Sequence, residues 1–405
     1  MRSNRWRARA AVVSFITLNS AVGADTGGSS QKAAYLNNLA AGCSSDAHYA
    51  EAEHHYREAL ELWRQKPGNE ASIALTLSNL GILLRRQARY SEAEIVDLEA
   101  LKMFEETFGP DHEKTASAFI NIGELYSAQA RFPEAESSLR RSLAILEKTR
   151  GENDADIAEA LGSLADLYTK QGKNEAAQQL LERALGIAEK AFGPSSKRLA
   201  LYLNNLSAVC ERQHKYKEAE KSAQRAIKIF EQTSGPNHPD LAAALINLAS
   251  VYFDLHSYQK AMELDRRALK INEGSFGPIH PVIANSLNNL GAVSFRLRRY
   301  DEAEALFQQA LSQWERSNWP NRTLMGDTLS NLGMVYVAKR RDSDALDFYK
   351  RAIDIHEAAL GPNSPRLAAD LEAYAGALRR VNDYAEAEKA SVRALGIQVR
   401  NSLHP

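Results

Sequence analysis

The sequence is poor in the residues that interrupt helices or cross-link a chain. Its 405 residues include 12 prolines, 22 glycines and only 2 cysteines. So little proline and glycine favours long, uninterrupted helices. Two cysteines exclude the disulfide framework that stabilises many small secreted domains. No apolar run approaches the roughly 18 residues that a membrane-spanning helix needs, so no membrane span is expected.

An excess of charge of either sign is also missing. The 50 basic and 51 acidic residues are mixed along the chain and give a net charge of −1. Without a basic stripe to neutralise phosphates, a nucleic acid is excluded as the expected partner. A chain of this length exceeds the size of one hydrophobic core, which indicates several domains or a repeat array.

The N-terminal segment differs from the rest of the chain. Arginines at positions 2, 5, 7 and 9 precede an apolar stretch at 10–20, and Val22 and Ala24 suit signal-peptidase cleavage. We therefore expect a signal peptide at 1–24, a flexible leader at 25–30 and a secreted or periplasmic protein. Polar residues within the apolar stretch leave a second interpretation, an irregular N-terminus on a cytoplasmic protein.

From residue 31 onward the sequence repeats with a period of 42 residues. The segment GPDHEKTASAFINIGELYSAQARFPEAESSLRRSLAIL at 109–146 recurs as GPSSKRLALYLNNLSAVCERQHKYKEAEKSAQRAIKIF at 193–230. The period holds without insertion from Asn69 to Asn363, and one earlier unit is offset by 41 residues. These units predict an all-α, right-handed superhelical solenoid of about nine helical hairpins over residues 31–405.

Each unit has small residues where its two helices must approach closely. A glycine, alanine or serine stands at one fixed place in the first helix of all nine units. An alanine stands at one fixed place in the second helix, and another small residue follows it seven positions later on the same helical face. The first of these alanines are Ala52, Ala93, Ala135, Ala177, Ala219, Ala261, Ala303, Ala345 and Ala387.

The joints between units carry signals for helix ends and starts. Glycine, usually followed by proline, ends most second helices, and a proline at 239, 281 and 365 suits the first turn of the next helix. His112, His238 and His280 recur at these joints, which predicts capping residues and not metal ligands. Residues that favour helix caps stand just before them or at the equivalent place in other units: Asn69, Asp111, Asn153, Ser195, Asn237, Asn321 and Asn363.

The 42-residue unit resembles the tetratricopeptide repeats of kinesin light chain and related bacterial arrays. GPNHP at 235–239, GPIHP at 277–281 and LNNL at 203–206 and 287–290 carry this resemblance, which covers residues 31–405. The resemblance implies a protein that binds other proteins or peptides. The coiled-coil heptads of kinesin light chain are absent, so association with a motor is not implied.

No catalytic, cofactor or metal site is expected. Cys43 and Cys210 occupy an aromatic core position of the first helix, which predicts that they fill the core. His54 and His55 are adjacent on a helix and point in different directions. No phosphate loop, nucleophile elbow or dinucleotide motif occurs. We therefore expect neither an enzyme nor a cofactor.

Asparagine recurs at one position of the first helix in seven of the nine units, although helix interiors disfavour it. A carboxamide offers both donors and an acceptor, so a row of them could hold the backbone of an extended peptide. The alternative is that each asparagine bonds the neighbouring first helix and fixes the stacking. Asparagines and apolar anchors combine best between residues 204 and 334, where the predicted peptide-binding residues are Asn204, Asn205, Asn247, Phe253, Asn288, Asn289, Phe295, Arg296, Asn331 and Met334.

The leading hypothesis is an interaction module that holds an extended segment of a protein or peptide partner in the concave groove of the superhelix. A second hypothesis is a structural scaffold or homo-oligomer, because no additional polar helix covers the edge of the last unit. A third is a sensor for a small signalling peptide.

Overall fold

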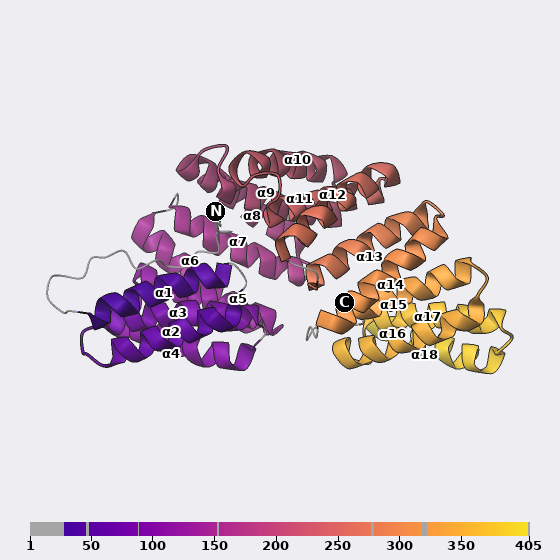
Figure 1. Cartoon of the computed structure of the whole chain (residues 1–405), viewed down its shortest axis with the longest axis horizontal. Coiled ribbons are helices and arrows are strands. Elements are labelled where there is room, and N and C mark those ends of the chain that lie inside the picture. The colour runs from indigo at the N-terminus through magenta and orange to yellow at the C-terminus, as the bar shows by residue number, and fades with distance from the viewer. Residues whose placement is uncertain are drawn as a thin grey trace, which may run out of the picture. The chain divides into compact units, whose positions relative to one another are not determined.

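The computed structural model describes residues 28–403, apart from residues 46–47, 88, 152–153, 277–278 and 318–321. The predicted signal peptide at 1–24 and the first half of the predicted leader lie outside this part of the chain. The described residues form 18 α-helices, which follow one another as antiparallel hairpins, as predicted (Figure 1). None of these helices is long and apolar enough to cross a membrane.

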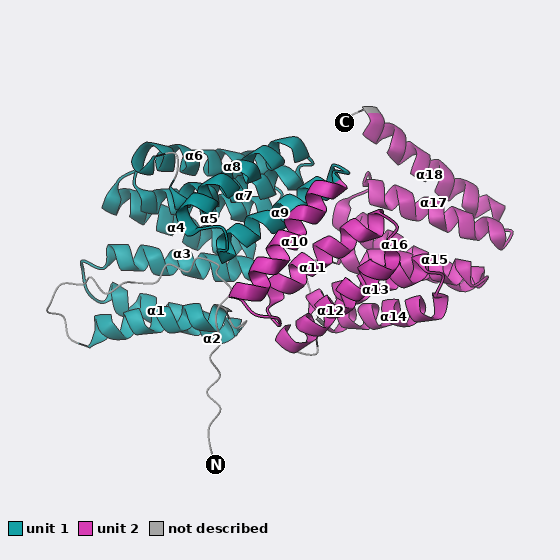
Figure 2. Cartoon of the chain, turned by 90° about the horizontal axis from the view of Figure 1, so that it is seen from above, with its two compact units in different colours: residues 1–215 teal, residues 216–405 magenta. Residues whose placement is uncertain are grey.

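The chain divides into two compact units, residues 1–215 and 216–405, which are coloured teal and magenta in Figure 2. In each hairpin the odd-numbered helix is the first helix and the even-numbered helix is the second. Unit 1 contains α1 (Ser29–Ser45), α2 (Tyr49–Arg64), α3 (Glu70–Arg86), α4 (Tyr90–Phe108), α5 (Glu113–Ala128), α6 (Phe132–Arg150), α7 (Ala155–Lys170), α8 (Asn174–Phe192) and α9 (Lys197–Arg212).

Unit 2 begins with the second helix of the fifth hairpin. It contains α10 (Tyr216–Thr233), α11 (Pro239–Asp254), α12 (Tyr258–Phe276), α13 (Pro281–Arg296), α14 (Tyr300–Ser317), α15 (Thr323–Ala338), α16 (Asp342–Leu360), α17 (Pro365–Arg380) and α18 (Tyr384–Leu403). Within each unit every helix packs against the next one in the sequence, and neighbouring first helices also touch, as α3 and α5 do in unit 1 and α13 and α15 in unit 2.

The predicted close approach within hairpins is confirmed. The nine alanines of the second helices are at most 1% exposed. A Cβ added to Gly291 would lie 2.7 Å from the ring of Phe307, and one added to Gly333 would lie 2.7 Å from the ring of Tyr349. Because such contacts are too short for real atoms, only a small residue allows the large ring opposite it to enter the core.

The joints between successive hairpins confirm the predicted capping histidines. They correct the other predicted helix caps. Nδ1 of His112, His238 and His280 accepts a hydrogen bond from the backbone N–H two residues later, at 3.1–3.2 Å. Asp111, Ser195, Asn237 and Asn363 stand one residue too early, because a turn that starts at the glycine includes them. The capping side chains are those of the next residues, Ser196 and Ser364 as well as the histidines.

Asn69 does occupy the cap position, but its amide donates to the carbonyls of Trp63 and Lys66 instead of capping α3. Asn153 and Asn321 lie outside the described residues. Asp154 caps α7 instead, since its side chain accepts from the N–H of Asp156. The glycines that end the second helices have the expected positive φ, for example 97° at Gly109.

Three buried polar pairs join consecutive hairpins of unit 2. In each pair a side chain near the end of a second helix meets the residue 14 positions later, in the next first helix. Asn272 donates to Ser286 at 3.0 Å, and the indole of Trp314 donates to Thr328 at 3.2 Å. The third pair joins His356 and Asp370. At two of the equivalent places in unit 1 the residues are apolar, Phe104 with Ala118 and Leu146 with Ala160.

The hairpin turns hold residues in the left-handed conformation at a spacing of 42. Gly172 occupies this place in one turn, whereas Ala130, His214, His256, Arg298, Arg340 and Asn382 occupy it in six others, with φ of 56–65°. A side chain with a Cβ is disfavoured in this conformation by about 1 kcal/mol or more.

Replacing Ala130 with glycine should therefore raise the free energy of unfolding, by up to about 1 kcal/mol, because glycine adopts a positive φ without strain. Thermal or urea unfolding of the full chain measures this change. The matched control is Ala243→Gly on the exposed side of α11, which should lower the free energy of unfolding by about 0.5–1 kcal/mol. A loss of stability in both variants would contradict the assignment of strain to residue 130.

The raised pKa of His356 predicts that the stability of the fold depends on pH. Burial alone would lower the pKa of His356, but hydrogen bonds to Asp327 and Asp370 outweigh burial and raise the pKa to about 10. The folded chain therefore keeps a proton that the unfolded chain loses near its ordinary pKa of 6.5. This contribution to stability should be complete below about pH 6.5 and be lost as the pH rises through about 10.

Urea unfolding at pH values from 6 to 10 tests this expectation. The free energy of unfolding should fall with rising pH in the parent chain and change less steeply in His356→Gln. Equal slopes in the two proteins would exclude His356 as the source of the pH dependence.

Candidate functional site

A pocket of about 370 Å³ opens on the first-helix face of unit 2. Helix α11 contributes one wall and α13 the other, and one residue of α12 reaches it from the second-helix layer. We call it the α11–α13 pocket. Its lining residues are Ile246, Asn247, Ala249, Ser250, Phe253, Asp254, Asp265, Asn289, Ala292 and Val293.

The α11–α13 pocket brings together three of the ten residues predicted to bind a peptide. Asn247 and Asn289 come from neighbouring first helices, and Phe253 lies one and a half turns beyond Asn247 on α11. Arg296 is placed beside them, since its guanidinium lies 5.5 Å from the centre of the Phe253 ring. These four residues form one local surface of amide, aromatic and cationic groups.

The other predicted residues of unit 2 have different surroundings. The amide of Asn331 donates to the carboxamide oxygen of Asn288 at 3.1 Å. Phe295 packs against the hydrophobic core, and its ring centre lies 5.6 Å from that of Tyr300. Met334 is 41% exposed on α15.

Asn204 and Asn205 belong to unit 1. Asn205 is exposed and lines a separate pocket of about 510 Å³, whose other walls come from α3, α5 and α7. This unit 1 pocket also contains Ser163, which stands at the asparagine position of its repeat, and the acidic residues Glu159 and Asp166.

Polar groups of the unit 1 pocket are largely bound to one another. Arg85 pairs with Glu124 at 2.5 Å, and Ser163 donates to the same carboxylate at 2.8 Å. Burial would raise the pKa of Glu124, but Arg85 and Ser163 outweigh burial and lower it. Lys170 pairs with Asp166 at 2.7 Å. Five of the polar side chains that line the pocket therefore already bind one another, whereas burial raises the pKa of a further lining residue, Glu159, to about 7.

The row of asparagines makes several of the bonds expected from the stacking alternative. Asn79 donates to Asn37 at 3.4 Å and Asn121 donates to Ser78 at 2.7 Å. Each bond joins two first helices of unit 1, as the Asn331 bond does in unit 2. For Asn289 the equivalent neighbour is Ile246, whose side chain cannot accept a hydrogen bond. Peptide contact by the remaining asparagines stays a prediction.

Asp265 is the pocket residue that sequence reasoning missed. It is 3% exposed, and its Oδ1 is buried without a hydrogen-bond partner. Burial raises the pKa of its carboxyl group to about 7. The sequence contains one signal that could have identified Asp265: an acidic residue stands at a position of the repeat where a core side chain is expected.

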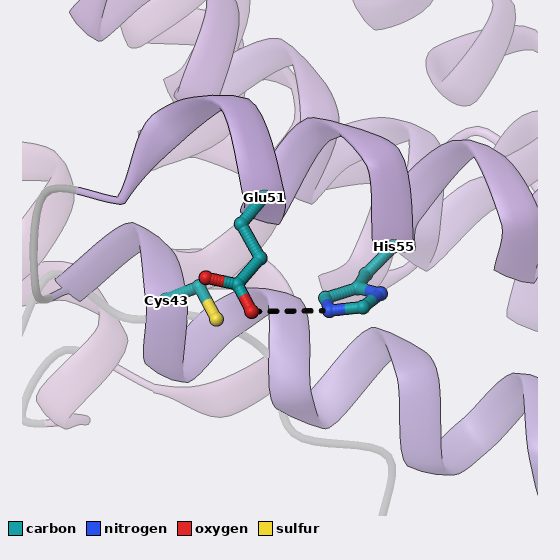
Figure 3. Close-up of side chains that lie close together, drawn as sticks. All are labelled: Cys43, Glu51 and His55. Atoms are coloured by element: carbon teal, nitrogen blue, oxygen red, sulfur yellow. Dashed lines mark ion pairs between the residues drawn. The ribbon is translucent and has the colours of Figure 1, made fainter.

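Two groups of side chains in unit 1 could hold a metal ion, and they share His55. In one of them His54, His55 and Glu58 lie close together, although the sequence predicted that the two histidines point in different directions. The other has a thiol as well. The ligand atoms of Cys43, Glu51 and His55 lie within 4.8 Å of one another, and Figure 3 shows them converging from α1 and α2. The imidazole Nε2 of His55 is 3.8 Å from the Glu51 carboxylate. Thiolate, carboxylate and imidazole are all zinc ligands. Sequence reasoning had placed Cys43 in the core, and Cys43 does pack against it, while Cys210 is fully buried.

The Asn288–Asn331 bond predicts a contrast between two asparagines on neighbouring first helices. Asn331→Ala removes the donor of a side-chain bond and should lower the free energy of unfolding by about 1 kcal/mol. Asn289→Ala removes a side chain that faces the α11–α13 pocket and should change stability by less than about 0.5 kcal/mol. Urea unfolding of both variants measures the difference, and equal losses would contradict the separate roles.

Comparisons with known proteins concern the fold of this chain and not its candidate site. No curated protein sequence matches this chain. The apo form of the quorum sensor NprR from B. thuringiensis is 16% identical, with a TM-score of 0.63 over 90% of this chain and 98% of that chain. A Rap protein complexed with Competence and Sporulation Factor is 16% identical, with a TM-score of 0.53 over 83% of this chain and 100% of that chain.

A putative kinesin light chain from Podosopora anserina, with nearly identical TPR-like repeats, is 19% identical. It covers 52% of this chain and 98% of its own length, with a TM-score of 0.44. The family model for the tetratricopeptide repeat matches residues 31–106, 72–148, 129–190, 156–232, 198–274, 282–358 and 324–398. These matches span nearly all of the predicted repeat region. The chain belongs to the tetratricopeptide repeat family.

Proposed function

We propose that this chain binds an extended segment of a partner protein across the first helices of unit 2. The observation that carries the proposal is the α11–α13 pocket, whose rim has a carboxamide on each side, Asn247 and Asn289. Each carboxamide can donate to a peptide carbonyl and accept from a peptide N–H. Phe253 adds the kind of aromatic anchor on which binding energy concentrates.

The size of the pocket suits a single side chain of a bound segment. Its volume is about 370 Å³. One long side chain would fill it while the backbone of the segment runs across the asparagines. Binding of this kind has no catalytic step, so the proposal describes an interaction module.

A narrower version of the proposal is a sensor for a small signalling peptide. Two proteins of similar fold are a quorum sensor and a Rap protein in complex with Competence and Sporulation Factor. Their similarity to this chain concerns the fold, so they support the idea of a peptide ligand without identifying one. A sensor would differ from an interaction module in the length of its ligand and in releasing it.

A second candidate function is self-association through α18. This helix exposes apolar side chains at Val392 (64%), Leu395 (60%) and Val399 (48%). A second copy could cover them, as solenoid proteins cover an open edge. Light scattering on the full chain would exclude self-association if it gave a single species of monomer mass.

The proposed groove is tested by replacing Asn247 and Asn289 together with alanine. Pull-down from a cell extract, followed by mass spectrometry, should recover fewer partner proteins with this variant than with the parent chain. Thermal stability should stay within a few kcal/mol of the parent, because none of these changes empties the core.

The matched control is a Gln224→Ala, Gln308→Ala variant, which removes exposed carboxamides from the second helices. This control should capture the same partners as the parent chain. If the double asparagine variant also captured them undiminished, the asparagines would not be the binding device.

A further inference from the structure

Asp265 stands at a position of the repeat where most hairpins have a core side chain. The position lies four residues after the buried alanine of the second helix. Most hairpins have a large residue there. In α14 and α16 this residue is an aromatic ring that packs on a glycine of the first helix: Phe307 packs on Gly291, and Tyr349 packs on Gly333. In α12 the short carboxylate of Asp265 takes the place of a ring, which leaves space between α11 and α13.

Asp97 stands at the same position of the repeat in unit 1, four repeats earlier. The surroundings of its carboxyl group differ from those of Asp265. Both carboxyl groups are 3% exposed, both have an Oδ1 without a partner, and burial raises the pKa of each to about 7. Asp97 packs directly onto Gly81, where even an added Cβ would lie 1.9 Å from its Oδ1. Asp265 faces Ala249 and lines a pocket instead.

Oδ1 of Asp265 is buried without a hydrogen-bond partner among the described residues. Burial is the only cause of its raised pKa, so no neighbouring cation among the described residues stabilises the carboxylate. The other charged residue that lines the pocket is Asp254 on α11. The guanidinium of Arg296 on α13 lies over the ring of Phe253, which also lines the pocket. A buried polar atom without a hydrogen bond is unfavourable, and a ligand that donates to it would recover part of that cost.

We propose that the α11–α13 pocket binds a lysine or arginine side chain, with Asp265 receiving its charged end. This inference rests on the proposed function, because the side chain would belong to the segment held by α11 and α13. Ile246, Ala249 and Val293 form an apolar wall that suits the methylene groups of such a side chain. Phe253 adds aromatic surface at the pocket, although its ring already faces the Arg296 guanidinium. Asp254 adds a second negative charge at the pocket.

Single amino-acid probes test the pocket without a known partner. The probes are N-acetyl-lysine methylamide and N-acetyl-arginine methylamide, with N-acetyl-norleucine methylamide as the uncharged control. Ligand-observed NMR on the full chain should show both basic probes binding at least fivefold more tightly than the norleucine probe. Asp265→Asn should remove this preference, whereas Asp97→Asn, the matched change in unit 1, should keep it.

The pH dependence of binding adds a readout that a purely structural role would not give. The cation needs ionised Asp265, whose pKa of about 7 makes that form scarce at pH 6 and predominant at pH 8. Affinity for the basic probes should therefore rise roughly tenfold between these pH values. No preference for the basic probes, or a preference that survives in Asp265→Asn, would overturn the proposal.

A displayed library of random peptides separates this inference from the proposed function. Peptides selected on the full chain should share one basic residue at a fixed place, and selection on Asp265→Asn should yield peptides without it. If peptides are selected with no basic preference, the pocket assignment is wrong and the groove remains. If the basic probes bind but no peptide is selected, the groove is wrong and the pocket remains.

Discussion

The close contact between the two helices of each hairpin is the constraint on which the rest of the structure depends. Nine alanines, all at most 1% exposed, let the second helix approach the first. Glycines such as Gly291 and Gly333 then admit a whole aromatic ring at the same level. Because these contacts use one face of each first helix, the opposite face is left for neighbouring hairpins and for ligands. A period of 42 residues repeats that arrangement along the chain.

The α11–α13 pocket arises where that constraint is broken. An aspartate in place of a large core side chain removes volume and adds a charge that the core cannot solvate. The comparison of Asp97 with Asp265 shows that the opposing residue decides the result. Glycine at 81 allows the helices to close over Asp97, whereas Ala249 and Asp265 remain on the wall of an open pocket. The same polar residue is thus a packing feature in one unit and a candidate binding group in the other.

The asparagines of the first helices show that one residue type can have two roles within a repeat array. Asn79, Asn121 and Asn331 each donate to the preceding first helix, so their amides hold repeats in register. Asn289 has an isoleucine at the equivalent place and faces the pocket. Unit 2 adds the buried pairs that end at Ser286, Thr328 and Asp370. Hydrogen bonds between second and first helices therefore add to those between first helices.

The sequence by itself determined the repeat, the hairpins, the small residues at their contacts and the capping histidines, because each depends on neighbours a fixed number of residues apart. It placed four caps one residue early, since the length of a glycine-initiated turn depends on backbone geometry. It also grouped ten candidate residues, of which three line the α11–α13 pocket. Only the tertiary structure decided which asparagines bond to each other, that Cys43 approaches Glu51 and His55, and that Asp265 lines an open pocket. Those outcomes depend on which side chains of three different helices meet, and the spacing within a repeat does not specify that.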